Sequence, residues 1–135
     1  MVGRGDGTFV PAVASPSLPG VNTAPGAVTS ADLDGDGTLD LAVIIAFPGS
    51  PNVYLGKGRG DGTFESWIWS RVGGVPKTLA VADLDADGRP DLLIGDAYSN
   101  TVAVMIGIGS CLFDPGGTLT VTSTPTETVG PDLDG

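Results

Sequence analysis

The sequence predicts an all-β fold made of four-stranded antiparallel sheets, of the kind that form the blades of a β-propeller. A unit of about 50 residues recurs, because "DLDGDGTLD" at Asp32 returns as "DLDADGRPD" at Asp83, and "DLDG" begins again at Asp132. Within each unit the apolar runs are short, rich in β-branched residues and bounded by Gly and Pro. A recurring unit of four short strands is typical of a propeller blade.

Two further landmarks recur in register with the acidic stretch. A proline precedes the first Asp by seven residues each time, at Pro25, Pro76 and Pro125. The block "GRGDGTF" ends at Phe9 and again at Phe64, and a divergent copy, "GIGSCLF", ends at Phe113. These landmarks divide the chain into the end of a preceding blade with a linker (1–24), a blade (25–75), a second blade (76–124) and the start of a truncated third (125–135). We therefore expect the chain to be a piece of a longer protein.

The strands are expected in the following order. In the first unit, "PGAVTSA" (25–31) leads into the acidic stretch, "LAVIIAF" (41–47) leaves it, and "PNVYLG" (51–56) and "FESWIWS" (64–70) follow. The second unit offers "PKTLAVA" (76–82), "LLIG" (92–95) and "TVAVMIG" (101–107). Continuous apolar runs of this length fit strands that are covered on both faces, although periodicity alone does not exclude a buried helix. The segment "TLTVTSTPTETV" (118–129) reads either as a Thr-rich linker or as a strand.

Composition excludes several classes of function. Sixteen acidic against six basic residues give a net charge of −10, which excludes nucleic acid as a partner because binding it requires clustered Lys and Arg. The longest apolar run, 41–47, is far shorter than the ~20 residues that span a bilayer, so no membrane insertion is expected. The single cysteine, Cys111, cannot form an internal disulfide.

The acidic stretches have the spacing of a loop that binds a hard divalent cation. Carboxylates stand at loop positions 1, 3, 5 and 9, and a glycine at position 6 permits a sharp turn. Position 7 would offer its backbone carbonyl, and Ca²⁺ accepts six to eight such oxygens. The predicted ligands are Asp32, Asp34, Asp36, Thr38 and Asp40 in the first loop and Asp83, Asp85, Asp87, Arg89 and Asp91 in the second, with Asp132 and Asp134 in a partial third.

Two other interpretations fit these loops less well. An EF-hand requires Glu at position 12, where this chain has Val43 and Ile94. A solvated turn explains a single Asp-Gly pair, but two carboxylates ~4 Å apart repel by ~4 kcal/mol at a dielectric of ~20, and the full pattern occurs twice. We therefore predict two Ca²⁺ sites. Calcium is preferred to Mg²⁺, which tends to keep its waters.

The residues "ADLDGDGTLDLAV" and "ADLDADGRPDLLIG", each followed by "LGKGRGDGTF" or its divergent copy, resemble the FG-GAP or VCBS repeat family. Such repeats form the blades of integrin α-subunit heads and of many bacterial secreted and surface proteins. The resemblance implies a propeller, usually of seven blades, with one Ca²⁺ in the hairpin loop between the first two strands of a blade. It also implies that the Asp residues named above are the ligands. At "GIGSCLF", before the last hairpin strand of that blade, the chain departs from the pattern because the usual Asp-Gly turn is lost.

From these features we expect a non-catalytic, calcium-binding recognition or adhesion scaffold located outside the cell or on its surface. Its partners would be a protein or glycan ligand and the other blades of the parent chain. The alternative is a propeller part of a secreted carbohydrate-active enzyme, a lyase or hydrolase, and a structural spacer is a third reading. "RGD" at 4–6 and 59–61 is predicted to be a structural turn, and Trp67 and Trp69 are predicted to pack against a neighbouring blade instead of stacking on sugars.

Overall fold

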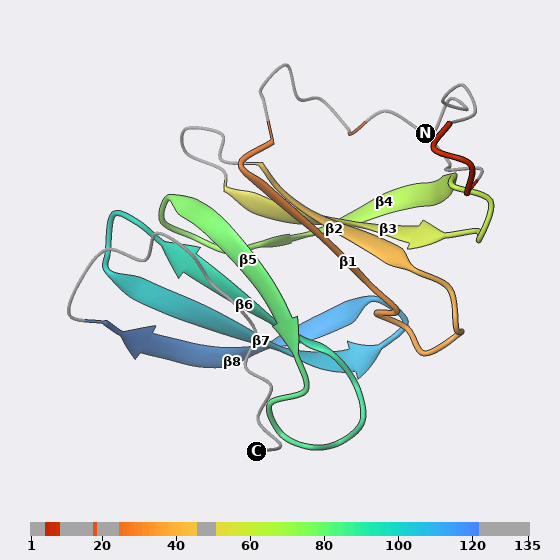
Figure 1. The fold of residues 1–135 in the computed structure, drawn as a ribbon. Coiled ribbons are helices and arrows are strands. Elements are labelled where there is room, and N and C mark those ends of the chain that lie inside the picture. Colours follow the sequence, from red (N-terminus) through yellow and green to blue (C-terminus); the bar gives the residue numbers. More distant parts are fainter. Residues whose placement is uncertain (1–4, 9–17, 19–24, 46–50, 122–135) are drawn as a thin grey trace.

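The computed structural model describes residues 5–8, 18, 25–45 and 51–121. The strands among these residues form two antiparallel sheets of four strands each. The first sheet has the order β1-β2-β3-β4 and the second the order β5-β6-β7-β8 (Figure 1). The bounds are Ala27–Ala31 (β1), Asp40–Ile45 (β2), Asn52–Gly58 (β3), Phe64–Arg71 (β4), Pro76–Ala82 (β5), Asp91–Asp96 (β6), Thr101–Gly109 (β7) and Leu112–Thr120 (β8). The all-β prediction is confirmed.

Each sheet is a simple meander in which consecutive strands are neighbours. In the first sheet Ala31 pairs with Asp40, and in the second Ala82 pairs with Asp91. The two acidic stretches therefore lie in corresponding hairpins of the two sheets. The first sheet lies within residues 25–75 and the second within 76–124. Two successive meanders of this kind have the form of propeller blades. Within the described part of the chain, no helix has the length and apolar character needed to cross a membrane.

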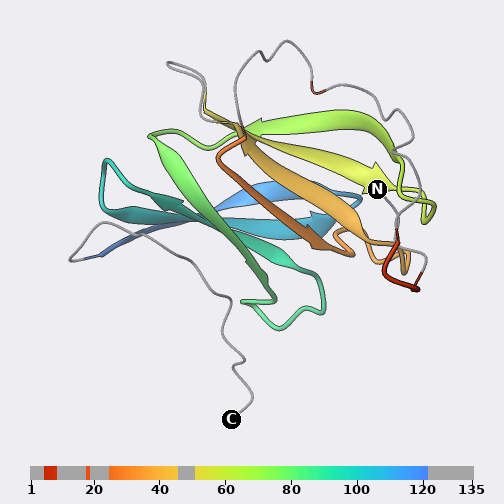
Figure 2. The same ribbon diagram turned by 45° about the horizontal axis from the view of Figure 1, so that its top comes forward.

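The two sheets pack face to face around a shared core. The first strands of each sheet, β1 and β5, lie side by side, as both Figure 1 and the turned view in Figure 2 show. The core draws buried residues from both sheets: Leu33, Ala42, Ile44, Val53 and Leu55 from the first, and Leu79, Leu92, Ile94, Met105 and Cys111 from the second. Burial of these apolar surfaces is the main force that holds the blades together.

Strand β2 is covered on both faces, as its unbroken apolar run predicts. Ala42 and Ile44 belong to the core between the sheets. Val43 and Ile45 point to the opposite face, where they pack with Tyr54 and the partly buried Trp67. The Trp67 ring also stacks on Phe64, with centroids 6.1 Å apart. Trp67 therefore packs on its own sheet, and Trp69, two residues along the same strand, is 61% exposed. Packing of the two tryptophans against a neighbouring blade stays a prediction.

The divergent block "GIGSCLF" forms a tight hairpin between β7 and β8. Gly109 pairs with Leu112, and the two residues between them, Ser110 and Cys111, both have φ of 56°. Two-residue hairpins favour positive φ at both central positions because that twist matches the strands. The loop is three residues shorter than its counterpart in the first sheet, where Gly58 pairs with Phe64. This shorter turn directs Cys111 into the core between the sheets.

Asp96, the last residue of β6, holds the segment that joins β4 to β5 against the second sheet by hydrogen bonds. One carboxylate oxygen accepts the N–H of Val75, which precedes β5, at 3.0 Å. The other accepts the N–H groups of Tyr98 and Ser99 in the β6–β7 turn, at 2.8 and 3.1 Å. Burial raises the pKa of this carboxyl, but the backbone donors outweigh burial, and the net effect is a pKa below its ordinary value.

Replacing Asp96 with Asn is expected to destabilise the chain by about 1–2 kcal/mol at pH 7, because the amide keeps one acceptor oxygen but turns an NH₂ group toward a backbone donor. The pKa of Asp96 is lower in the folded than in the unfolded chain, so its stabilisation is complete above the unfolded value of about 4 and disappears as the pH falls through the folded value. Urea unfolding of both proteins from pH 7 to pH 2.5 should therefore show curves that converge in acid. A constant difference across that range would contradict this role.

Candidate metal centre

The acidic loops connect the first two strands of each sheet, at corresponding positions. The first loop, residues 32–39, joins β1 to β2, and the second, residues 83–90, joins β5 to β6. Figure 2 shows the first loop at the ends of β1 and β2 and the second at the ends of β5 and β6. In each case one strand precedes the loop and its antiparallel neighbour follows it, so the chain must turn sharply between them. Asp and Gly satisfy that requirement.

Asp32, at position 1 of the first loop, accepts three backbone hydrogen bonds. Its Oδ1 accepts from Gly35 at 2.8 Å and from Asp36 at 3.0 Å, and its Oδ2 accepts from Gly37 at 2.8 Å. Gly35 and Gly37 have φ of 81° and 85°, a region that other residues enter only with strain. The three backbone N–H groups of the turn therefore all point to the Asp32 carboxylate, and this conformation places Asp34 and Asp36 close to Asp32.

Three carboxylates of the first loop converge closely enough to share one ion. One oxygen from each of Asp32, Asp34 and Asp36 lies within 4.8 Å of the others. Oxygens bound to one Ca²⁺ at ~2.3–2.6 Å lie at most ~5.2 Å apart, so this group has the dimensions of a calcium shell. The donor set consists of hard oxygens only. These residues therefore fit a hard divalent cation.

Lys57, which the sequence analysis did not single out, brings its ammonium into the first loop from β3. It forms ion pairs with Oδ2 of Asp34 and, at 3.0 Å, with Oδ2 of Asp36. The hydrogen bond from Lys57, together with the backbone N–H of Thr38, lowers the pKa of Asp36. The two carboxylates raise the pKa of Lys57 in turn. A positive charge therefore occupies the loop without any metal.

Asp40, at position 9, is fully buried and holds three segments of the first sheet together. Its Oδ2 accepts the N–H of Leu33 at 2.8 Å, and its Oδ1 accepts the N–H of Gly58 in β3 at 2.8 Å. In the second sheet Asp91 is equally buried and accepts from Leu84 and Gly107, both at 2.7 Å. The Asp spacing predicts a metal ligand at position 9 but does not indicate this structural role. Both oxygens of Asp91, and Oδ1 of Asp40, retain a second lone pair for a cation.

The two glycines that donate to these buried aspartates have no room for a side chain. A Cβ on Gly58 would overlap the backbone carbonyl of Leu39, and a Cβ on Gly107 would overlap that of Pro90. The strand and the end of the loop therefore touch backbone to backbone. This close approach sets the position of each acidic loop against its own sheet.

The second loop gathers a different set of carboxylates. Oxygens of Asp83, Asp85 and Asp91 lie within 4.8 Å of one another, which brings position 9 into the group in place of position 5. Asp87, at position 5, pairs with the Arg89 guanidinium at 2.8 Å. Gly88, with φ of 83°, donates to Asp83 at 2.9 Å, as Gly37 does to Asp32. Ala86 adopts φ of 60° where the first loop has Gly35.

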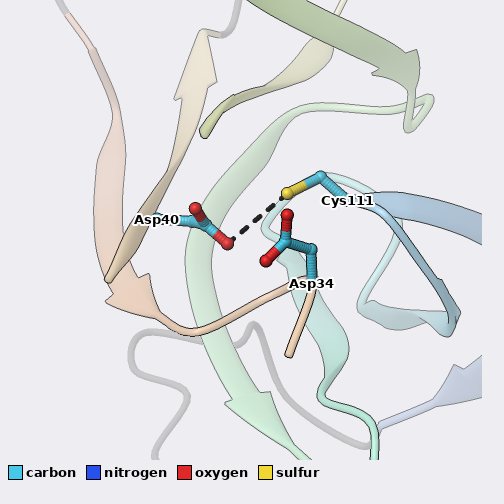
Figure 3. A group of neighbouring side chains, drawn as sticks. All are labelled: Asp34, Asp40 and Cys111. Carbon is cyan, nitrogen blue, oxygen red and sulfur yellow. Dashed lines mark hydrogen bonds between the residues drawn. The ribbon is translucent and has the colours of Figure 1, made fainter. Parts of the chain in front are cut away.

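Cys111 extends from the second sheet into the first acidic loop. Figure 3 shows its sulfur beside the carboxylates of Asp34 and Asp40, with a hydrogen bond of 3.5 Å to Oδ2 of Asp40. Burial, assisted by the Asp40 carboxylate, raises the pKa of the thiol to about 12. Cys111 is therefore a neutral donor at pH 7, and it links the second blade to the loop of the first. Spacing alone offered no signal for this contact.

The remaining predicted ligands have the following positions. Thr38 and Arg89 stand at position 7, and their N–H groups donate to Asp36 and Asp87, both at 2.8 Å. Coordination by their carbonyl groups stays a prediction. Asp132 and Asp134 lie outside the described residues.

The "RGD" at 59–61 lies in the turn between β3 and β4. Its aspartate, Asp61, accepts both the N–H and the hydroxyl of Thr63, at 2.9 and 2.6 Å. Asp6 makes the same two bonds to Thr8 in the earlier copy, at 2.9 and 2.6 Å. The carboxylate of each tripeptide is therefore used inside its own turn.

Comparison with known proteins places the chain in a family. A family model described as an FG-GAP-like repeat matches residues 1–43 and again residues 42–94, so each match contains one of the two complete acidic loops. No curated protein matches the chain, and no solved structure matches it. The two matches cover well over half of the 135 residues. The chain belongs to the family of FG-GAP-like repeat proteins.

Proposed function

We propose that the chain is a calcium-binding module of an extracellular β-propeller that serves as a recognition or adhesion scaffold. The observation that supports this most directly is the convergence of three carboxylates in each of two loops that occupy the same hairpin of successive blades. Repulsion among such groups costs several kcal/mol at an effective dielectric of ~20 unless a cation offsets it. Membership of the FG-GAP-like repeat family agrees with a repeat module of this type.

The residues that would hold the ions are those of the two loops. In the first they are Asp32, Asp34 and Asp36, with Asp40 and the Thr38 carbonyl completing the shell. In the second they are Asp83, Asp85 and Asp91, with Asp87 and the Arg89 carbonyl. A bound Ca²⁺ would supply positive charge and fix the loop conformation. The aspartates at position 9 transmit that order to β3 and β7 through their backbone hydrogen bonds.

We propose a non-catalytic role for this chain. It contains no histidine, and its single thiol is buried and protonated at neutral pH. In the two loops, the carboxylates are already engaged with backbone donors and paired cations. The binding partner would be a protein or a glycan that contacts the loops at the ends of the blades. Such loops carry binding function when a rigid scaffold holds them.

A thermal melt of the 135-residue chain tests calcium binding. Extracellular modules bind Ca²⁺ with Kd values of ~0.1–1 mM, so at 1 mM each occupied site should add roughly 0.4–1.4 kcal/mol. We expect the circular-dichroism transition to move upward by a few degrees in 1 mM CaCl₂ relative to excess chelator.

The double variant Asp32→Asn/Asp83→Asn should lose this calcium-dependent shift. Asp114→Asn provides the charge-matched control, because Asp114 is exposed on β8, outside both loops, and this variant should keep the shift. Identical cooperative melts of the wild-type chain with and without calcium would contradict the proposal and leave the loops as solvated turns.

A further inference from the structure

The two acidic loops are equal in formal charge but differ in where their cations lie. Each has four aspartates, and each has one paired basic side chain. In the first loop Lys57 contacts Asp34 and Asp36, two of the three carboxylates that converge there. In the second loop Arg89 contacts Asp87, which is not one of the converging three. A difference in metal affinity between the loops would therefore arise from the position of the basic side chain and not from the net charge of the loop.

Lys57 and Ile106 occupy structurally equivalent positions. Lys57 directly precedes Gly58, whose N–H donates to Asp40. Ile106 directly precedes Gly107, whose N–H donates to Asp91. The first blade therefore places an ammonium beside its loop where the second blade has an apolar side chain, which packs beside Gly116. Among the described residues, no lysine or arginine forms an ion pair with Asp83, Asp85 or Asp91.

The Lys57 ammonium and a divalent ion would compete for the same oxygens. Its nitrogen is within hydrogen-bonding distance of Oδ2 of Asp34 and 3.0 Å from Oδ2 of Asp36. The Asp34 side chain is only 6% exposed, so little solvent separates the two charges. An ion held by these carboxylates would lie close enough to the ammonium to be repelled by it. The Lys57 side chain is 39% exposed, which gives the ammonium a route out to water.

We propose that Lys57 is a tethered cation that competes with divalent ions for the first loop, so that the second loop fills at a lower calcium concentration. The inference rests on the proposed function, because it concerns the same two loops. In the absence of calcium, Lys57 neutralises part of the first loop and holds it in the folded conformation. As calcium rises, the second loop fills first, and the first loop fills only when the ion displaces the ammonium.

The two loops can be followed separately in one sample by ¹H–¹⁵N NMR during a CaCl₂ titration of the full chain. The reporters are the amides of Gly37 and Gly88, which donate to Asp32 at 2.8 Å and to Asp83 at 2.9 Å. In the wild-type chain we expect the midpoint for Gly88 to lie up to about fivefold below that for Gly37, because ion pairing at a partly exposed site contributes up to about a factor of five. This comparison requires no variant to fold.

Lys57→Met should bring the Gly37 midpoint down toward that of Gly88 and leave the Gly88 midpoint unchanged. Lys77→Met is the matched control, since it removes the same charge from an exposed position on β5 and should preserve the difference between the loops. Lys57→Arg keeps the positive charge and should also preserve the difference between the Gly37 and Gly88 midpoints. Equal midpoints in the wild type, or a Gly37 midpoint that Lys57→Met does not lower, would overturn the tethered-cation inference while calcium binding stands. If neither amide responds to calcium, both this inference and the proposed function are wrong.

Discussion

Replacing Asp40 with Ala is expected to destabilise the chain by about 3–5 kcal/mol when no calcium is present. The side chain is fully buried and accepts the N–H groups of Leu33 and Gly58. Alanine would leave both donors buried without a partner, and each such loss costs ~1–3 kcal/mol, or more where the acceptor is charged. Small domains are stable by only ~5–15 kcal/mol in total. The measurement is urea unfolding in excess chelator, which separates this structural role from any role in metal binding.

Asp36→Ala is the comparison for that experiment, because Asp36 belongs to the same loop but is 36% exposed. We expect it to cost less than about 1 kcal/mol in chelator. Asp91→Ala should reproduce the large loss in the second blade, where Asp91 accepts from Leu84 and Gly107. Asp40→Asn, which keeps one acceptor oxygen, serves if the alanine variant does not fold. Equal losses for Asp40→Ala and Asp36→Ala would show that the buried hydrogen bonds contribute little.

Gly58→Ala is expected to destabilise the chain by about 2–4 kcal/mol. The new Cβ would overlap the carbonyl of Leu39 and approach Cγ2 of Thr38 to 3.2 Å. The obstacle is mainly backbone, so either the strand or the acidic loop must move. That movement would break the hydrogen bond from Gly58 to Asp40. The cost therefore combines overpacking of ~1–3 kcal/mol with the loss of a hydrogen bond to a charged group.

Gly26→Ala is the matched control for Gly58→Ala. Its Cβ would meet its nearest neighbours, atoms of Ile44 and Pro76, at 3.8 Å, which is ordinary van der Waals contact. Its stability should stay within about 0.5 kcal/mol of the wild type. Urea midpoints of the two variants, measured side by side in chelator, provide the test. A Gly58→Ala protein as stable as Gly26→Ala would mean that the loop does not rest against β3 in solution.

Local sequence determined most of the architecture. The unbroken apolar run at 41–45 predicted a strand buried on both faces, and Ile44 and Ile45 are buried on opposite sides of the first sheet. The recurrence of Asp32 as Asp83 predicted two equivalent hairpins, and both loops join the first two strands of a sheet. Such features are encoded by residues close together in the chain, where periodicity and turn chemistry act directly.

The composition of each acidic centre depended on contacts that no local pattern contains. Lys57 reaches the first loop from another strand, and Cys111 reaches it from the next sheet. The Asp spacing is identical in the two loops, yet Asp36 groups with Asp32 and Asp34 in the first loop, whereas in the second Asp91 and not Asp87 groups with Asp83 and Asp85.

The sequence by itself determined that the chain is all-β, that its unit is a four-stranded sheet and that each unit presents one cluster of aspartates. The tertiary structure decided which carboxylates share a cluster and that Lys57 pairs with the first cluster. The physical reason is that strand formation follows from the pattern of neighbouring residues, whereas the balance of charge in a loop depends on every group brought within a few ångströms of it. Only the packing of β3 against its loop, and of the second sheet on the first, sets those distances.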